Sequence, residues 1–312
     1  GFVSIEIDPN LTLTSDIIEE GKKLYNAIKM PNVMIKIPAI SSGFDAMCEL
    51  MKKGINVNAT LIFSKDQAQN CLDAFKEGTK KYSKKFPQTP LPQGVISVFV
   101  SRFDRLLDEK LEETGKFGIY NATNIYNKIQ NAGQRNVRTL FASTGVKSNQ
   151  LPADYYIKEL LYPNSINTAP LDTIKSVIAS GEFTPKTIPS SEEIDRFMTK
   201  AKEAGVDYNK VCNKLLDDGI FTAAKYNKIH QTIDEQFINR LFFRAMLFLE
   251  FEVRKNQLIK QINCEEQFVD LNNLENYKKI LACIEARGKA QLLRGIEYDS
   301  ISTVKTKNEL KK

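Results

Sequence analysis

Six short apolar segments constrain the fold of this chain more than any other feature of its sequence. They are nearly continuous in valine, isoleucine and phenylalanine, and they span residues 2–7, 33–37, 57–63, 95–100, 139–143 and 165–169. Such runs are typical of strands that are buried on both faces of a parallel sheet. The sequence therefore predicts six parallel strands.

Longer stretches with helical spacing of apolar residues separate these strands. They span residues 15–29, 44–53, 66–86, 119–129 and 154–161. Repeated alternation of strand and helix predicts an α/β fold built from βα units. A TIM-type (β/α)8 barrel has eight strands, so we expect an incomplete barrel whose first two strands precede Gly1; the alternative is an open, doubly wound sheet. Polar residues at the strand ends favour the barrel, because its active site lies at the carboxyl ends of the strands.

The chain changes character after its sixth strand. Residues 171–180 and 191–218 read as helices, and Ser190 is a candidate helix cap. From residue 221 the sequence is rich in Asn, Gln and Lys, with helical stretches around 234–262 and 272–293, and the last dozen residues read as disordered. We therefore predict a barrel-type domain over residues 1–220 and a helical, mildly basic extension over residues 221–312.

Charge and hydropathy restrict the partners of this protein. The net charge is +6, of which residues 1–220 carry about +2 and residues 221–312 about +4. Neither part contains a dense block of Lys and Arg, so we expect no nucleic-acid partner. No apolar run approaches the roughly 18 residues of a membrane helix, so we expect no membrane partner.

The number and spacing of the cysteines and histidines exclude several kinds of active site. The five cysteines are scattered and lack CxxC spacing, which indicates neither a zinc site nor a disulfide framework. Reduced thiols fit a cytoplasmic protein. The one histidine, His230, lies beyond the predicted strands, so chemistry in residues 1–220 proceeds without a histidine triad or histidine-bound metal.

Two charged residues stand inside apolar strands. Lys36 lies between Ile35 and Ile37, and Glu6 lies in the first strand. Burial among apolar groups lowers the pKa of a lysine, and a neutral amine is a nucleophile toward carbonyls. An inward glutamate moves protons or orients water. The structural alternatives are that Lys36 extends out of a strand end and that Glu6 forms an ion pair with a lysine of the barrel.

Polar groups on later strands suggest a substrate site. Asn56, Asn58 and Thr60 alternate with apolar residues, so they share one face of the third strand. Buried polar groups need partners, which a substrate or an ordered water supplies. Arg102 and Lys147 follow two neighbouring strands, and two cations on adjacent βα loops suit a phosphate. Taken singly, each cation is more commonly an ordinary surface charge.

In this order the segments resemble the transaldolase family over residues 1–220. The likeness is most specific at residues 33–39, which resemble the family's Schiff-base strand four, and at residues 54–64, which resemble its strand five. Residues 2–8, 97–102, 140–147 and 165–170 resemble strands three, six, seven and eight. The resemblance implies catalytic roles for Lys36, Glu6 and Thr60 and substrate-binding roles for Asn58, Ser97, Phe99, Arg102 and Lys147.

The resemblance also implies features outside these strands. Many family members have Ser or Thr where this chain has Ile40. The family's first two strands, with a proton-shuttling aspartate and a substrate-binding asparagine, would precede Gly1. A terminal helix that closes the active site is expected to begin near residues 215–219. No metal or organic cofactor is expected.

The implied function is Schiff-base transfer of a dihydroxyacetone unit between ketose and aldose phosphates in the non-oxidative pentose phosphate pathway. Sugar phosphates are therefore the expected partners, and a homodimer is a further expectation. Three alternatives stay open: a related Schiff-base aldolase, an inactive or phosphosugar-binding fragment, and an interaction protein that acts through its helical tail. An open barrel admits water around Lys36, so we expect low activity from the chain alone.

Overall fold

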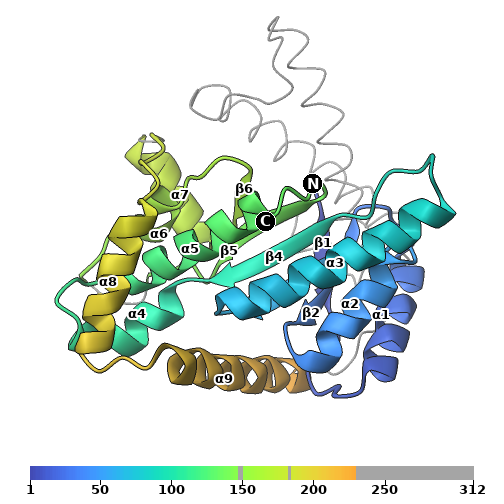
Figure 1. Ribbon diagram of the computed structural model, residues 1–312, viewed down its shortest axis with the longest axis horizontal. Coiled ribbons are helices and arrows are strands. Elements are labelled where there is room, and N and C mark those ends of the chain that lie inside the picture. The colour runs from blue at the N-terminus through green and yellow to red at the C-terminus, as the bar shows by residue number, and fades with distance from the viewer. Residues whose placement is uncertain (147–149, 182–183, 230–312) are drawn as a thin grey trace, which may run out of the picture. The chain divides into compact units, whose positions relative to one another are not determined.

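One sheet organises the computed structural model, which describes residues 1–146, 150–181 and 184–229 (Figure 1). Its six strands follow chain order, and neighbours from β3 to β6 run parallel. The bounds are β1 Val3–Glu6, β2 Val33–Pro38, β3 Asn56–Ile62, β4 Gly94–Phe99, β5 Val137–Ala142 and β6 Ser165–Asn167. All six lie where the apolar segments place them, so the predicted α/β fold is confirmed, with the six strands expected of an incomplete TIM-type barrel.

Helices follow the strands as the sequence predicts, with two differences. Their bounds are α1 Thr14–Ile28, α2 Ser41–Met51, α3 Lys65–Lys85, α4 Ser101–Leu107, α5 Phe117–Asn131, α6 Tyr155–Glu159, α7 Leu171–Ser180, α8 Ser191–Glu203 and α9 Tyr208–Ile229. Helix α4 was not predicted, because seven residues give too short an apolar period to recognise. The stretch predicted as one helix over 191–218 is two helices, because Gly205 adopts φ +85° between them.

Contacts divide the chain into two compact units. Among the described residues, the larger unit contains Glu6–Lys22 and Ile35–Ile229, and the smaller contains Gly1–Ile5 and Lys23–Met34. Every described residue with a predicted site role belongs to the larger unit. Helix α9 runs through residue 220 without a break, and the predicted helices and disorder beyond residue 229 lie outside the described residues. The proposed division at residue 220 therefore stays a prediction.

Aromatic side chains join the later strands to the helices that cover them. Phe141 on β5 packs against Tyr126 of α5 and against Tyr162, with ring centroids 6.1 and 5.7 Å away. Phe197 of α8 packs on Tyr120 of α5 at 4.6 Å. The predicted cap of α8 is present, since the Ser190 hydroxyl accepts a hydrogen bond from the backbone N–H of Glu193. These contacts hold α5 against the face of β5 that carries Phe141.

A bulge interrupts β3 directly after Thr60. The register with β4 shifts between Ala59 and Ile62, and Leu61 has φ +59°, in the left-handed region. A bulge leaves an extra residue outside the sheet ladder and re-aims the side chains beside it. The bulge lies at the carboxyl end of the strand, next to the predicted site residues.

A buried carboxylate on α4 makes stability depend on pH. Asp104 is 1% exposed and accepts hydrogen bonds from the Gly118 N–H and the Tyr156 hydroxyl, each at 2.8 Å. Burial nevertheless raises the pKa of Asp104 to about 7. A raised carboxyl pKa means that the folded state binds more protons than the unfolded state between about pH 4 and 7. The free energy of unfolding should therefore fall as pH rises through this window.

Replacing Asp104 with Asn should remove this slope. We expect the wild-type protein to lose up to about 4 kcal/mol relative to Asp104→Asn between pH 4 and pH 8. Urea unfolding at several pH values measures the difference. Asp217→Asn, at an exposed position on α9, is the matched control and should keep the wild-type slope. Parallel curves for wild type and Asp104→Asn would contradict the assignment.

Candidate active site

Lys36 and Glu6 form an ion pair on neighbouring strands. The Lys36 Nζ lies 2.8 Å from Glu6 Oε2, and the two side chains are 28% and 30% exposed. Lys36 is the one residue of β2 that is not fully buried, since its strand neighbours face the core. The amine therefore sits on an apolar strand yet remains reachable, with a carboxylate in place to exchange protons with it. Glu6 therefore forms an ion pair with a lysine, and this pair leaves the Lys36 amine accessible to a substrate.

The next two strands bring together a second pair of predicted residues. The Ser97 hydroxyl on β4 donates a 2.6 Å hydrogen bond to Asn58 Oδ1 on β3, and both residues are buried. Neighbouring Asn56 accepts a hydrogen bond from the Gln93 N–H at 2.9 Å, at the start of β4. Asn58 and Ser97 thus form a buried polar pair between β3 and β4, whereas Asn56 bonds the backbone just before β4.

Thr60 has an unsatisfied hydroxyl. The residue is fully buried, and its Oγ1 has no hydrogen-bond partner among the described residues. Its carbonyl accepts a 2.9 Å bond from the Ala39 N–H, which ties the end of β2 to β3. A buried hydroxyl without a partner is rare in a folded protein. It suits a group that binds a water or a substrate oxygen.

Arg102 lies at the start of α4, over the ring of Phe99. The guanidinium carbon is 5.0 Å from the ring centroid. Burial lowers the pKa of Arg102, and Arg105 lowers it further, whereas Asp218 of α9 raises it. Arg102 stays protonated despite these shifts, because the guanidinium group is not deprotonated in proteins. Arg102 therefore offers a charged fork beside an aromatic face at the carboxyl end of β4.

Helix α9 packs directly against these residues. A Cβ added at Gly219 would lie 2.9 Å from Leu61 Cδ2 and 3.2 Å from Arg102 Nη1, so a larger residue here would have to displace one of these side chains. Figure 1 shows α9 running from the end of α8 toward α2. The helix begins at Tyr208, earlier than the expected start near residues 215–219. The family resemblance implied a terminal helix that closes the active site, but it did not predict a contact of this helix with Arg102.

One backbone carbonyl anchors the first turns of α9. The Phe63 carbonyl, just beyond β3, accepts hydrogen bonds from Asn121 Nδ2 at 2.9 Å and from Cys212 Sγ at 3.4 Å. The Tyr208 hydroxyl donates to Asn121 Oδ1 at 2.8 Å. Burial raises the pKa of Cys212 to about 12, so this thiol is a hydrogen-bond donor and not a nucleophile. The spacing of apolar residues in the sequence did not predict these hydrogen bonds.

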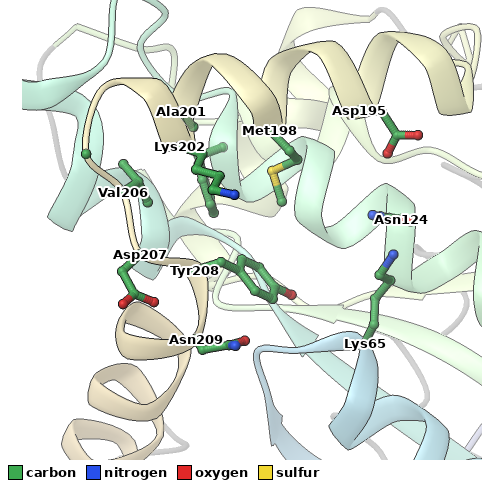
Figure 2. A pocket seen from close by; sticks show the side chains of 12 residues that line it. Lys65, Asn124, Asp195, Met198, Ala201, Lys202, Val206, Asp207, Tyr208 and Asn209 are labelled. Atoms are coloured by element: carbon green, nitrogen blue, oxygen red, sulfur yellow. The ribbon is translucent and has the colours of Figure 1, made fainter.

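Two pockets flank the anchor. One, of about 720 Å³, lies between α3, α5, α8 and α9; Figure 2 shows Lys65 and Lys202 extending on different sides of the Tyr208 ring. The other, of about 630 Å³, is lined by residues that include Ala39 and Ile40, just after β2, and Gln67 in the first turn of α3. The first contains none of the predicted site residues. None of them lines the second pocket either, which lies just after β2, beside the start of α3 and the first turns of α9.

The structure therefore groups most of the predicted residues into three contacts: Lys36 with Glu6, Asn58 with Ser97, and Phe99 with Arg102. Lys147 lies outside the described residues. No cluster of three or more metal-binding side chains occurs within the described ranges. No helix of the described part is both long and apolar enough to cross a bilayer.

The family model for transaldolase/fructose-6-phosphate aldolase matches residues 1–233. A transaldolase of Campylobacter jejuni is 48% identical over 229 residues, covering 70% of this chain and 69% of that protein. A transaldolase of Helicobacter pylori is 38% identical over 223 residues, covering 70% and 67%. A citrate lyase crystal structure from Burkholderia xenovorans aligns at 10% identity over 77% of this chain and 88% of that one, with a TM-score of 0.32, too low to inform the fold.

Proposed function

Because this chain belongs to the transaldolase/fructose-6-phosphate aldolase family, we propose that it transfers a dihydroxyacetone unit from a ketose phosphate to an aldose phosphate. The expected donors are fructose 6-phosphate and sedoheptulose 7-phosphate, and the expected acceptors are erythrose 4-phosphate and glyceraldehyde 3-phosphate. The observation that carries this proposal is the reachable Lys36 amine, 2.8 Å from the Glu6 carboxylate.

The first step joins Lys36 to the substrate. Glu6 accepts a proton from Lys36, and the neutral amine attacks the C2 carbonyl to form a carbinolamine. Glu6 then returns a proton to the carbinolamine hydroxyl through a water that the Thr60 hydroxyl holds. Water leaves, and the iminium remains. The unsatisfied Thr60 Oγ1 supports this role, because the water would supply the partner it lacks.

The second step breaks and remakes a carbon–carbon bond. The iminium accepts the electrons of the C3–C4 bond as the C4 hydroxyl loses its proton, and the shortened aldose phosphate departs. A general base takes this proton and later returns it to the aldehyde oxygen of the acceptor. Asn58 and Ser97 hold the hydroxyls of the three-carbon enamine, whose C3 attacks the aldehyde carbon of the acceptor. Hydrolysis of the new iminium restores Lys36.

An assay of acceptor dependence tests the proposal against its nearest alternative. A transaldolase releases product from fructose 6-phosphate in step with added erythrose 4-phosphate, whereas an aldolase releases free dihydroxyacetone without an acceptor. We expect acceptor-dependent formation of sedoheptulose 7-phosphate. Release of dihydroxyacetone at the same rate with and without acceptor would favour the aldolase, and the absence of both products together with no covalent adduct would refute the proposal.

Arg102 should bind the substrate phosphate. Replacing it with Ala removes a charge-assisted hydrogen bond, which typically contributes about 1.5–3 kcal/mol, so KM for fructose 6-phosphate should rise about 10- to 150-fold. Arg105→Ala, an exposed arginine on the same helix, is the matched control and should change KM less than twofold. Equal KM values for Arg102→Ala and wild type would place the phosphate elsewhere. The same role for Lys147 stays a prediction.

We also propose a cytoplasmic location and a homodimer. The free thiols of Cys48, Cys71 and Cys212 support the location, since reduced cysteines are usual in that compartment. Light scattering coupled to size-exclusion chromatography tests the assembly. A monomeric mass at micromolar concentration would exclude a stable dimer.

A further inference from the structure

The Gln67 side chain links the ends of the two strands that carry the proposed reacting groups. Its Nε2 donates to the carbonyl of Ala39, at the end of β2, and to that of Leu61, in the β3 bulge, each at 3.0 Å. Its Oε1 accepts from the backbone N–H groups of Phe63 at 2.9 Å and Ser64 at 3.1 Å. One amide therefore makes four hydrogen bonds to the backbone of two strand ends.

These hydrogen bonds replace those that the bulge removes from the ladder. Leu61 has φ +59° and interrupts the β3–β4 register, so its carbonyl and the following N–H groups need other partners. Gln67 supplies both kinds, a donor for Leu61 and an acceptor for Phe63. The amide thus fixes the bulge that directly follows Thr60.

The same amide fixes the strand that carries Lys36. Ala39 lies three residues after Lys36, and its carbonyl bonds Gln67 while its N–H bonds the Thr60 carbonyl. From this geometry we infer that Gln67 is a positioning residue, which holds Lys36 and Thr60 at the spacing that carbinolamine dehydration needs. The catalytic role of Gln67 rests on the proposed function, whereas its hydrogen bonds to the two strand ends do not. A misplacement of about 1 Å in a reacting group can cost about 10²-fold in rate.

Helix capping is the competing explanation, because Gln67 also completes a capping box with Ser64, whose hydroxyl accepts from the Gln67 N–H at 3.1 Å. Gln67→Glu separates the two roles. A glutamate at this position still accepts from the strand-end N–H groups and still completes the box, but an ionised carboxylate donates nothing to Ala39 or Leu61. Ser64→Ala removes the cap bond and leaves the amide link intact.

The two variants should diverge in kinetics. We expect Gln67→Glu to lower kcat and the rate of borohydride trapping at Lys36 about 10- to 100-fold, with KM for fructose 6-phosphate within twofold. Ser64→Ala should lower the melting temperature by a few degrees and keep kcat within twofold. A wild-type kcat in Gln67→Glu, or an equal loss in Ser64→Ala, would overturn the inference. If Gln67→Glu does not fold, Gln67→Ala is compared with Ser64→Ala instead. Both variants lose the capping box, and only Gln67→Ala loses the link between the strand ends.

Hydrogen exchange separates failure of this inference from failure of the proposed function. Loss of the link should speed exchange in peptides covering residues 37–40 and 58–62 in Gln67→Glu, and Ser64→Ala should leave both at the wild-type rate. If wild type shows neither transfer nor trapping but exchange responds in this way, the link stands and the proposed function fails. If wild type is active and Gln67→Glu changes neither exchange nor kcat, the link fails alone.

Discussion

Replacing Lys36 with Arg should lower turnover at least about 10³-fold and abolish covalent trapping of substrate. The guanidinium retains its charge and its ion pair with Glu6, but it stays protonated in proteins and cannot attack a carbonyl. Borohydride added with fructose 6-phosphate should leave a three-carbon adduct on Lys36 of the wild-type chain. Mass spectrometry of the peptide that contains Lys36 measures this adduct after a single turnover, so slow turnover does not obscure it.

Lys53→Arg is the matched control for this experiment. Lys53 is exposed just beyond α2, and its replacement should leave both trapping and turnover at wild-type levels. An adduct on a different lysine, together with an active Lys36→Arg variant, would reject Lys36 as the nucleophile. The Lys36→Arg variant should fold, because arginine keeps the positive charge that pairs with Glu6, and a melting temperature close to that of wild type checks this.

Replacing Glu6 with Gln should slow turnover about 10²- to 10⁴-fold, the usual cost of losing a positioned acid–base group. The amide keeps the shape of the side chain and still bonds Lys36, but it exchanges no proton with the amine or with the carbinolamine. Iminium formation should therefore become slow, while KM for the ketose phosphate changes little. Trapping by borohydride should still label Lys36, at a rate that falls in parallel with kcat.

Glu19→Gln provides the comparison for Glu6. Glu19 is exposed on α1, and its replacement should have no kinetic effect. If Glu6→Gln retains wild-type kcat, Glu6 is only the structural ion partner of Lys36. If kcat is retained but KM rises, the carboxylate contacts substrate and takes no part in proton transfer.

The sequence by itself determined the strand–helix order and the identity of most proposed site residues. Apolar runs such as residues 33–37 and 95–100 form β2 and β4, because a nearly continuous apolar run of this length is typical of a strand that is buried on both faces. Lys36 and Glu6 were conspicuous for the same reason, since a charged residue inside such a run is costly without a partner. Their ion pair follows from placing the two strands side by side.

The tertiary structure alone decided how the strand ends are held. The four hydrogen bonds of Gln67 and the contact of Gly219 with Arg102 join residues that are 3 to 117 positions apart. The bulge at Leu61 lies on backbone that departs from regular dihedral angles. Residue periodicity reports which face of a strand or helix is apolar, and it carries no information about these contacts. They form because buried backbone groups outside the sheet ladder must find partners, and only the packed chain determines which side chains are close enough to supply them.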